Sequence, residues 1–100
     1  REFMYVDDAS DAIIFLLKNY SHSEPINIGS GQEINIITLA NLIAKIVGYH
    51  GEISLDKTKP DGAPRKLLDS TKLNDLGWKP KVELEDGLIK TYNWFNKLDK

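Results

Sequence analysis

Four amphipathic stretches, separated by breaks rich in glycine, proline and polar residues, constrain this 100-residue chain to a small helix-rich fold. Within each stretch apolar residues recur at intervals of three and four, which is the spacing of one helix face. A chain of this length forms at most one small domain. The predicted apolar stripes are, in chain order, Ala9, Ile13, Leu16, Leu17 and Tyr20; Leu39, Leu42, Ile43, Ile46 and Val47; Leu73 and Leu76; and Leu88, Tyr92 and Phe95.

Residues suited to starting and ending helices stand at the boundaries of these stretches. The predicted N-caps are Asp7, Asn35 and Asp69, and the predicted stops are Gly48 and Gly77. Trp78 falls where the outer residue of a Schellman motif packs against Leu73. The last helix is expected to begin near Leu84, with two acids in its first turn.

Three short extended segments complete the predicted structure. Residues 1–6, 26–28 and 52–55 each suggest a brief strand. The turn Gly29-Ser30-Gly31 after the second segment lacks the third glycine of a dinucleotide-binding fingerprint, so a tight turn is the better interpretation. The prediction is about four helices and two or three short strands around a thin core.

Composition excludes several classes of function. The net charge is −2 and the pI about 5.6, whereas bulk nucleic-acid or membrane-surface binding requires a basic face. No apolar run approaches the roughly 20 residues of a membrane span. The chain has no cysteine, which rules out disulfides and thiolate metal sites. These features, with no visible signal segment, are those of a cytoplasmic protein.

Residues 59–66, Lys-Pro-Asp-Gly-Ala-Pro-Arg-Lys, form a charged loop stiffened by two prolines. Arg65 offers a planar fork for phosphate oxygens and Lys66 a mobile point charge. Asp61 can accept hydrogen bonds from a hydroxyl or a base N–H, and Gly62 permits a tight turn. A phosphorylated ligand carrying such donors, for example a nucleotide sugar, fits the loop. The alternative is a solvated connector, and composition alone favours that alternative.

No catalytic or metal-binding set stands out. His22 and His50 both lie in polar stretches, where exposed loop positions are the simplest interpretation. The acids Asp7, Asp8 and Asp11 can hold a cation, but helix capping and solvation explain them more simply. Arg1, just before an apolar extended segment, can point its guanidinium into a cleft.

The order of motifs resembles the C-terminal part of extended short-chain dehydrogenase/reductases. The shared segments are Arg-Glu-Phe-Met-Tyr-Val-Asp-Asp at residues 1–8 and Ile-Asn-Ile-Gly-Ser-Gly at residues 26–31. Lys-Pro-Asp-Gly-x-Pro-Arg-Lys-Leu-Leu-Asp at residues 59–69, with Leu-Gly-Trp at 76–78, is more selective and is similar to GDP-L-fucose synthases. Thr-Tyr-x-Trp-Phe at 91–95 agrees. The resemblance implies an α/β enzyme, of which residues 1–100 are a single, small α+β substrate-binding lobe.

The resemblance also implies a reaction. GDP-4-keto-6-deoxy-D-mannose is epimerised at carbons 3 and 5, and NADPH then reduces the 4-keto group to give GDP-L-fucose. NADP and the catalytic residues of this family lie in an N-terminal Rossmann domain that has no counterpart in these 100 residues. We therefore expect a fragment without cofactor, metal or catalytic residues, inactive alone, whose partners are the GDP-sugar and its own Rossmann domain. A full-length homodimer is expected, with no nucleic-acid or membrane partner.

By the same resemblance, Arg1, Asp61 and Lys66 match substrate-contacting residues. Arg65 is either a fourth contact or one half of a structural salt bridge, and Lys59 is a surface residue. Two alternatives stay open. The chain can belong to another nucleotide-sugar epimerase or dehydratase of the same superfamily, or it can be a non-catalytic binding or assembly module.

Overall fold

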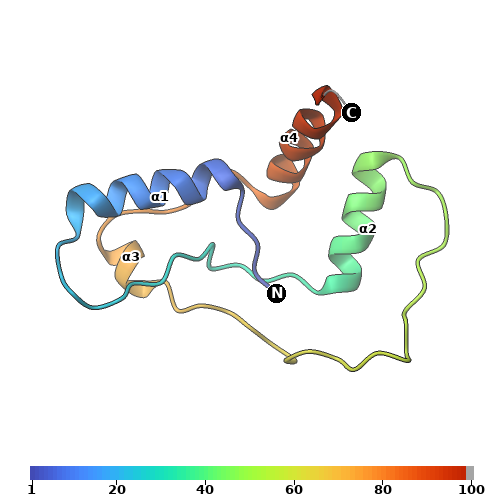
Figure 1. Ribbon diagram of the computed structural model, residues 1–100, viewed down its shortest axis with the longest axis horizontal. Coiled ribbons are helices and arrows are strands. Elements are labelled where there is room, and N and C mark those ends of the chain that lie inside the picture. Colours follow the sequence, from blue (N-terminus) through green and yellow to red (C-terminus); the bar gives the residue numbers. More distant parts are fainter. Residues whose placement is uncertain (99–100) are drawn as a thin grey trace.

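The computed structural model describes residues 1–98, and within them the secondary structure is helical (Figure 1). The helices are α1 (Val6–Asn19), α2 (Ile36–Val47), α3 (Thr71–Asp75) and α4 (Leu84–Lys97). α1 and α3 lie at one end of the molecule, and α2 and α4 pack together at the other. The predicted number of helices is confirmed.

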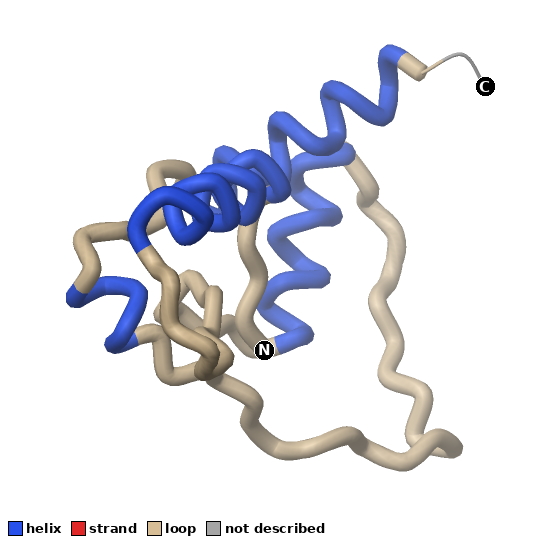
Figure 2. Tube along the Cα trace, turned by 60° about the vertical axis from the view of Figure 1, so that its left-hand side comes forward, coloured by secondary structure: helices blue, strands red, loops and turns tan. Residues whose placement is uncertain are grey.

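The predicted strands are not found in residues 1–98, where Figure 2 shows helices and loops only. The extended residues near the N-terminus make one isolated antiparallel bridge, between Glu2 and Glu33. A strand requires a partner along several residues, and each of the short extended segments has at most this single bridge. The prediction of two or three strands is therefore wrong for the described residues.

A small apolar cluster joins α1 to α3. Ala12, Leu73 and Trp78 are buried together, and Met4, Phe15, Leu16, Ile26 and Ile28 pack around them. The Schellman motif at the end of α3 is confirmed. The Trp78 N–H donates to the Leu73 carbonyl at 3.3 Å, and the N–H of Gly77, which has φ +109°, donates to the Asn74 carbonyl at 2.9 Å.

The predicted apolar face of α1 is only partly confirmed, because Ala9, Leu16 and Tyr20 are half-buried and Leu16 packs against the core. Ile13 and Leu17 are 53% and 79% exposed, whereas Ala12 is fully buried. The run Ile-Ile-Phe-Leu-Leu at residues 13–17 places apolar side chains on most sides of the helix, so periodicity does not select one face. The buried face is the one on which small Ala12 lets Leu73 and Trp78 approach closely.

The predicted caps are partly confirmed. The Asn35 side chain accepts from the N–H groups of Ile37 and Thr38, and Gly48 ends α2 with φ +78°. The prediction of Asp7 as N-cap is wrong, because the N-cap is Tyr5, two residues earlier, and α1 begins at Val6. Asp69 lies one residue outside the N-cap of α3, yet its carboxylate accepts from the Thr71 N–H at 3.0 Å.

α4 begins at Leu84 as predicted, but its buried face is narrower than expected. Leu88 and Tyr92 are half-buried, and Phe95 is exposed. Gly87 is buried, because α4 approaches the Tyr5 side chain so closely that a Cβ at this position would lie 3.0 Å from Tyr5 Cβ.

Two acids of α1 hold the connection between α3 and α4. The Asp8 carboxylate, which is 3% exposed, accepts from the backbone N–H groups of Lys81 at 3.2 Å and Val82 at 3.0 Å. Asp11 accepts from Trp78 Nε1 at 2.9 Å and pairs with the Lys81 ammonium at 3.5 Å. The acidic cluster thus orients the chain around the small core.

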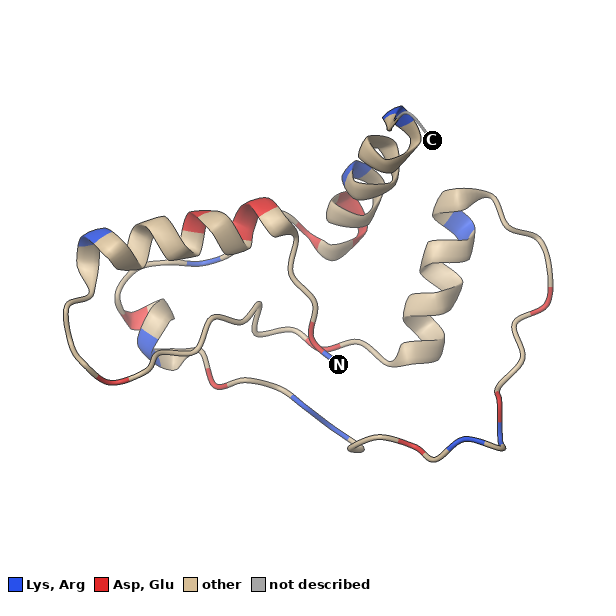
Figure 3. Ribbon diagram, viewed as in Figure 1, with Lys and Arg blue, Asp and Glu red and all other residues tan. Residues whose placement is uncertain are grey.

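The molecule is extended rather than closely packed. Its radius of gyration is 16.4 Å, whereas a compact chain of this length measures about 13 Å. Residues 48–70 run around the outside without helix or strand (Figure 1). Charged residues of both signs are distributed along this segment, while α2 carries little charge (Figure 3). Among the described residues, no helix is long and apolar enough to span a membrane.

We expect Asp8→Ala to lower the free energy of unfolding by about 2–3 kcal/mol, because two backbone donors lose a charged, buried acceptor. Asp86→Ala is the matched control. Asp86 occupies the same third position of α4 and is exposed, so its loss removes only the interaction with the helix dipole, about 0.3–1 kcal/mol. Urea unfolding followed by tryptophan fluorescence compares the two variants, and equal losses would contradict the assigned role of Asp8.

A second prediction concerns pH. The hydrogen bond from Trp78 holds the pKa of Asp11 below its usual value, and the charge of Lys81 acts in the same direction. A depressed pKa stabilises the fold above the unfolded pKa of about 3.9, and this contribution is lost as the pH falls through the folded value. Asp11→Asn should therefore lower the melting temperature near pH 6, with the difference closing toward pH 3. A pH-independent difference would exclude this linkage.

Candidate functional site

A pocket of about 680 Å³ lies between the N-terminal segment, the start of α2 and the charged loop. Its wall brings together residues that are far apart in the sequence: Arg1, Glu33 to Ile36, and Asp61 to Arg65. One wall is set by the pairing of Arg1 with Ile34, whose backbone N–H groups donate to each other's carbonyls at 2.9 and 2.8 Å. This pairing places the side chains of Arg1 and Glu33 beside the loop.

Arg1 holds the charged loop directly. Its Nη1 donates to the Ala63 carbonyl at 2.7 Å. Gly62 leaves room for this guanidinium, because a Cβ there would lie 2.9 Å from Arg1 Nη2 and the arginine would have to shift. The sequence suggested instead that Gly62 serves a tight turn. Gly62 is not among the glycines with left-handed φ in residues 1–98, so its lack of a side chain matters through the contact with the guanidinium.

Arg65 forms a two-point ion pair with Glu33. Nε donates to Glu33 Oε2 at 2.9 Å, and Nη2 lies 2.6 Å from Oε1. The hydrogen bond from Arg65 lowers the pKa of Glu33, and the same contact raises the pKa of Arg65. Both side chains are therefore charged at neutral pH. The sequence left Arg65 open between a ligand contact and a salt bridge, and the geometry is that of a salt bridge.

Glu2 anchors the far end of the loop. Its carboxylate accepts from the Gly31 N–H at 2.7 Å and from the Leu68 N–H at 3.2 Å. Gly29 gives this carboxylate room, because a Cβ there would lie 2.8 Å from both Glu2 Oε2 and Ser70 Oγ. Glu2 thereby connects the N-terminal segment, the glycine turn and the chain that follows Lys66.

The remaining predicted residues differ in position. Asp61 lines the pocket and is exposed. Lys66 is also exposed but lies just beyond the lining, directly after Arg65. The structure therefore brings Arg1, Asp61 and Arg65 around one cavity and places Lys66 at its margin. Lys59 is exposed, consistent with the predicted surface position.

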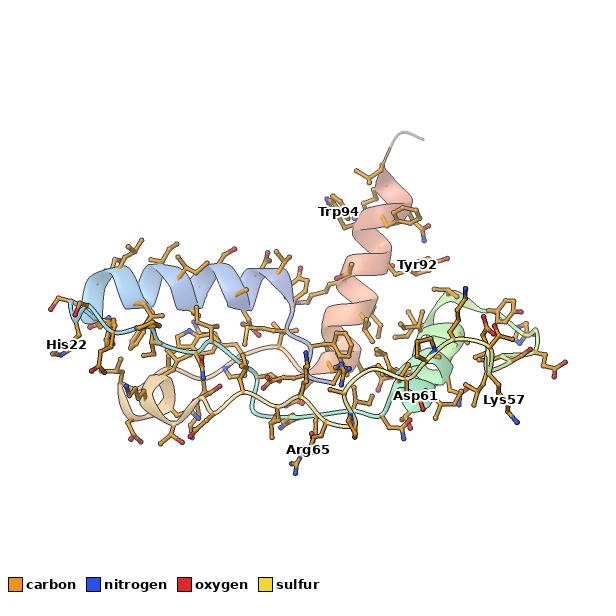
Figure 4. All side chains as sticks on the ribbon, turned by 60° about the horizontal axis from the view of Figure 1, so that its bottom comes forward. His22, Lys57, Asp61, Arg65, Tyr92 and Trp94 are labelled. Carbon is orange, nitrogen blue, oxygen red and sulfur yellow. The ribbon has the colours of Figure 1, made fainter. Side chains whose placement is uncertain are left out.

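Sequence reasoning missed Glu2 and Glu33, the two acids that accept from the loop. Glu2 lies in the predicted extended segment 1–6, and Glu33 lies between the predicted glycine turn and the predicted N-cap Asn35, where no role was predicted for either acid. His22 lies at the opposite end of the molecule from Asp61 (Figure 4). Within residues 1–98, no three acids or histidines gather as a metal site.

Comparison with known proteins places this geometry in context. GDP-L-fucose synthase 1 of Arabidopsis thaliana is 58% identical to the chain over 97 residues, which cover 97% of the chain and 30% of that relative. The chain matches a segment of the GDP-L-fucose synthases. The resemblance predicted from the sequence is confirmed, and the chain spans about 30% of the length of this relative. No family model matches the chain.

Solved structures share the fold. A GDP-6-OMe-4-keto-L-xylo-heptose reductase from Campylobacter jejuni superposes with a TM-score of 0.87 at 35% identity, covering 96% of this chain and 30% of that protein. UDP-glucose 4-epimerase from Thermotoga maritima gives a TM-score of 0.86 at 35% identity, covering 97% and 31%. The helix-rich segment is therefore built like the corresponding part of nucleotide-sugar reductases and epimerases, whichever nucleotide they carry.

Proposed function

We propose that this chain is the GDP-sugar-binding lobe of a GDP-L-fucose synthase. The complete enzyme would epimerise GDP-4-keto-6-deoxy-D-mannose at carbons 3 and 5 and reduce its 4-keto group with NADPH. One observation carries the proposal. The segment 59–69, which resembles GDP-L-fucose synthases most selectively, contacts Arg1 and lines a pocket with it through residues 61–65, in a chain 58% identical to such an enzyme over 97 residues.

The roles follow from the chemistry of the pocket margin. Arg1 and Lys66 supply positive charge for a diphosphate, and Arg1 has N–H donors beyond the one held by Ala63. Asp61 accepts hydrogen bonds from a sugar hydroxyl or a base N–H. Cations that hold the diphosphate bind the substrate and the transition state almost equally, because the charge of the phosphates is constant during hydride transfer.

The rest of the enzyme would cover the exposed apolar surface. Ile13, Ile14 and Leu17 form an outward apolar face on α1, and the chain is too extended to bury that face itself. We assign this face to contact with an N-terminal Rossmann domain that binds NADP. The enzyme would act in the cytoplasm as a homodimer.

A second candidate is another nucleotide-sugar epimerase or dehydratase. The 0.86 TM-score with a UDP-glucose 4-epimerase favours it, because the fold alone does not choose the nucleotide. The two candidates differ in the ligand that binds. Calorimetric titration of the full-length protein with GDP-sugar and UDP-sugar separates them, and preference for the UDP-sugar would reject the GDP-L-fucose synthase assignment.

The 100-residue chain alone should neither bind NADPH tightly nor oxidise it. Its glycine turn at residues 29–31 lacks the full pyrophosphate-binding pattern, and it carries no predicted catalytic acid paired with a lysine. The measurement is NADPH absorbance with the purified chain and GDP-4-keto-6-deoxy-D-mannose. Steady oxidation that depends on this substrate would show that catalytic groups lie within the chain.

In the full-length enzyme, Lys66→Ala should raise KM for the GDP-sugar about ten- to a hundredfold and leave kcat nearly unchanged. The reason is loss of a charge-assisted contact worth about 1.5–3 kcal/mol in ground state and transition state alike. Lys59→Ala, on the same exposed loop, is the matched control and should leave both constants near the parent values. A collapse of kcat with constant KM would assign Lys66 to the chemical step instead.

A further inference from the structure

The charged loop is fixed to the rest of the chain at three points, all on the paired segments around Glu2 and Glu33. The Ala63 carbonyl accepts from Arg1 at 2.7 Å, and the Arg65 guanidinium pairs with Glu33. The Leu68 N–H donates to Glu2 at 3.2 Å. Lys66 lies between the second and third anchors, with its own side chain in solvent.

We propose that Glu33, through Arg65, is a positioning residue that holds Lys66 and Asp61 in their binding geometry. This inference rests on the proposed function, because positioning Lys66 and Asp61 matters only if the loop binds a ligand that carries a diphosphate. Glu33 would touch no substrate atom. It would act by removing freedom from the loop before the ligand arrives, and preorganisation of this kind raises affinity by lowering the cost of ordering on binding.

The ion pair is suited to positioning rather than to direct anion binding. Arg65 Nε and Nη2 both face Glu33, at 2.9 and 2.6 Å from its two oxygens. A phosphate could take these donors only by displacing a carboxylate of the same sign, and matched two-point geometry strengthens the existing pair. The Glu33 side chain is 35% exposed and the Arg65 side chain 69% exposed, so only the carboxylate is partly shielded from solvent.

Contacts next to the ion pair also anchor the loop. Arg1 donates to the carbonyl of Ala63, two residues before Arg65. Glu33 sits next to Ile34, whose backbone is paired with that of Arg1. One paired segment therefore carries both anchors of the loop centre, and loss of either should loosen residues 61–66 without opening the core around Ala12, Leu73 and Trp78.

The experiment is a double-mutant cycle in the full-length protein with Glu33→Gln, Arg65→Gln and the pair together. We expect each single variant to raise KM for the GDP-sugar about three- to tenfold with kcat within about twofold of the parent, and the double variant to add nothing further. Glu24→Gln is the matched control, because it breaks the exposed Glu24–Lys72 pair of 3.3 Å at a site remote from the loop. It should leave both constants unchanged.

The sign of the effect decides between the roles of Arg65. If Arg65 bound the diphosphate and Glu33 merely competed for it, Glu33→Gln would lower KM while Arg65→Gln raised it, and the proposal would be overturned. Unchanged KM in Glu33→Gln would overturn it as well. If that variant misfolds, the charge-swapped double variant Glu33→Arg with Arg65→Glu replaces it. A KM equal to that of the parent then supports the proposal, and a KM above that of the parent opposes it.

A second readout does not depend on the ligand. Exchange of the Leu68 N–H, which donates to Glu2 at 3.2 Å, should quicken in Glu33→Gln and not in Glu24→Gln. Unchanged exchange there would overturn the anchoring. A parent enzyme that failed to bind GDP-sugar would reject the proposed function, whereas a parent that binds it, with exchange and KM unmoved by Glu33→Gln, would reject this inference alone.

Discussion

The Asp8 carboxylate is the interaction on which the arrangement of the helices depends. It is buried near the start of α1 and accepts backbone N–H groups from Lys81 and Val82, in the segment that leads from α3 to α4. A buried charge is tolerated only when donors surround it, so this segment has little freedom to move. Asp11 reinforces it through Trp78, whose ring belongs to the small core. The apolar core is small, and these polar contacts help to fix how the helices are arranged around it.

The same device recurs at the candidate site. Glu2 and Glu33 are acids on short extended segments, and both accept from the loop that carries the candidate ligand contacts. Residues 48–70 have no regular backbone hydrogen bonding to keep them in place. Side-chain carboxylates take over that task, which explains how a long irregular segment can present defined charges. Glycine serves the arrangement where side chains would obstruct it, at Gly29 and Gly62.

The sequence predicted the local features well, because each depends on a few neighbouring residues. Asn35, Gly48 and the Gly77–Trp78 ending of α3 follow from capping chemistry alone. The strands were predicted wrongly and the buried face of α1 only in part correctly, because both depend on distant partners. The run of residues 13–17 is apolar on several sides, and only contact with Leu73 and Trp78 selects the side of Ala12. At the site, the charged loop was identified from its own residues, but Glu2 and Glu33 were not, since their partners lie 66 and 32 positions away.

The cations around the pocket differ in how far they are already engaged, and this difference bears on how such a site can work. Arg65 is neutralised by Glu33, and Arg1 is partly occupied by a carbonyl. Lys66, in contrast, is exposed beside them, on a backbone held from both sides. Fixing the backbone lowers the entropic cost of binding an anion through the flexible ammonium, whereas three unpaired cations around one pocket would repel each other before any ligand arrived. Pairing one arginine with a carboxylate therefore both removes repulsion and rigidifies the loop, and it leaves the charge of Lys66 unpaired by that carboxylate and available to the proposed ligand.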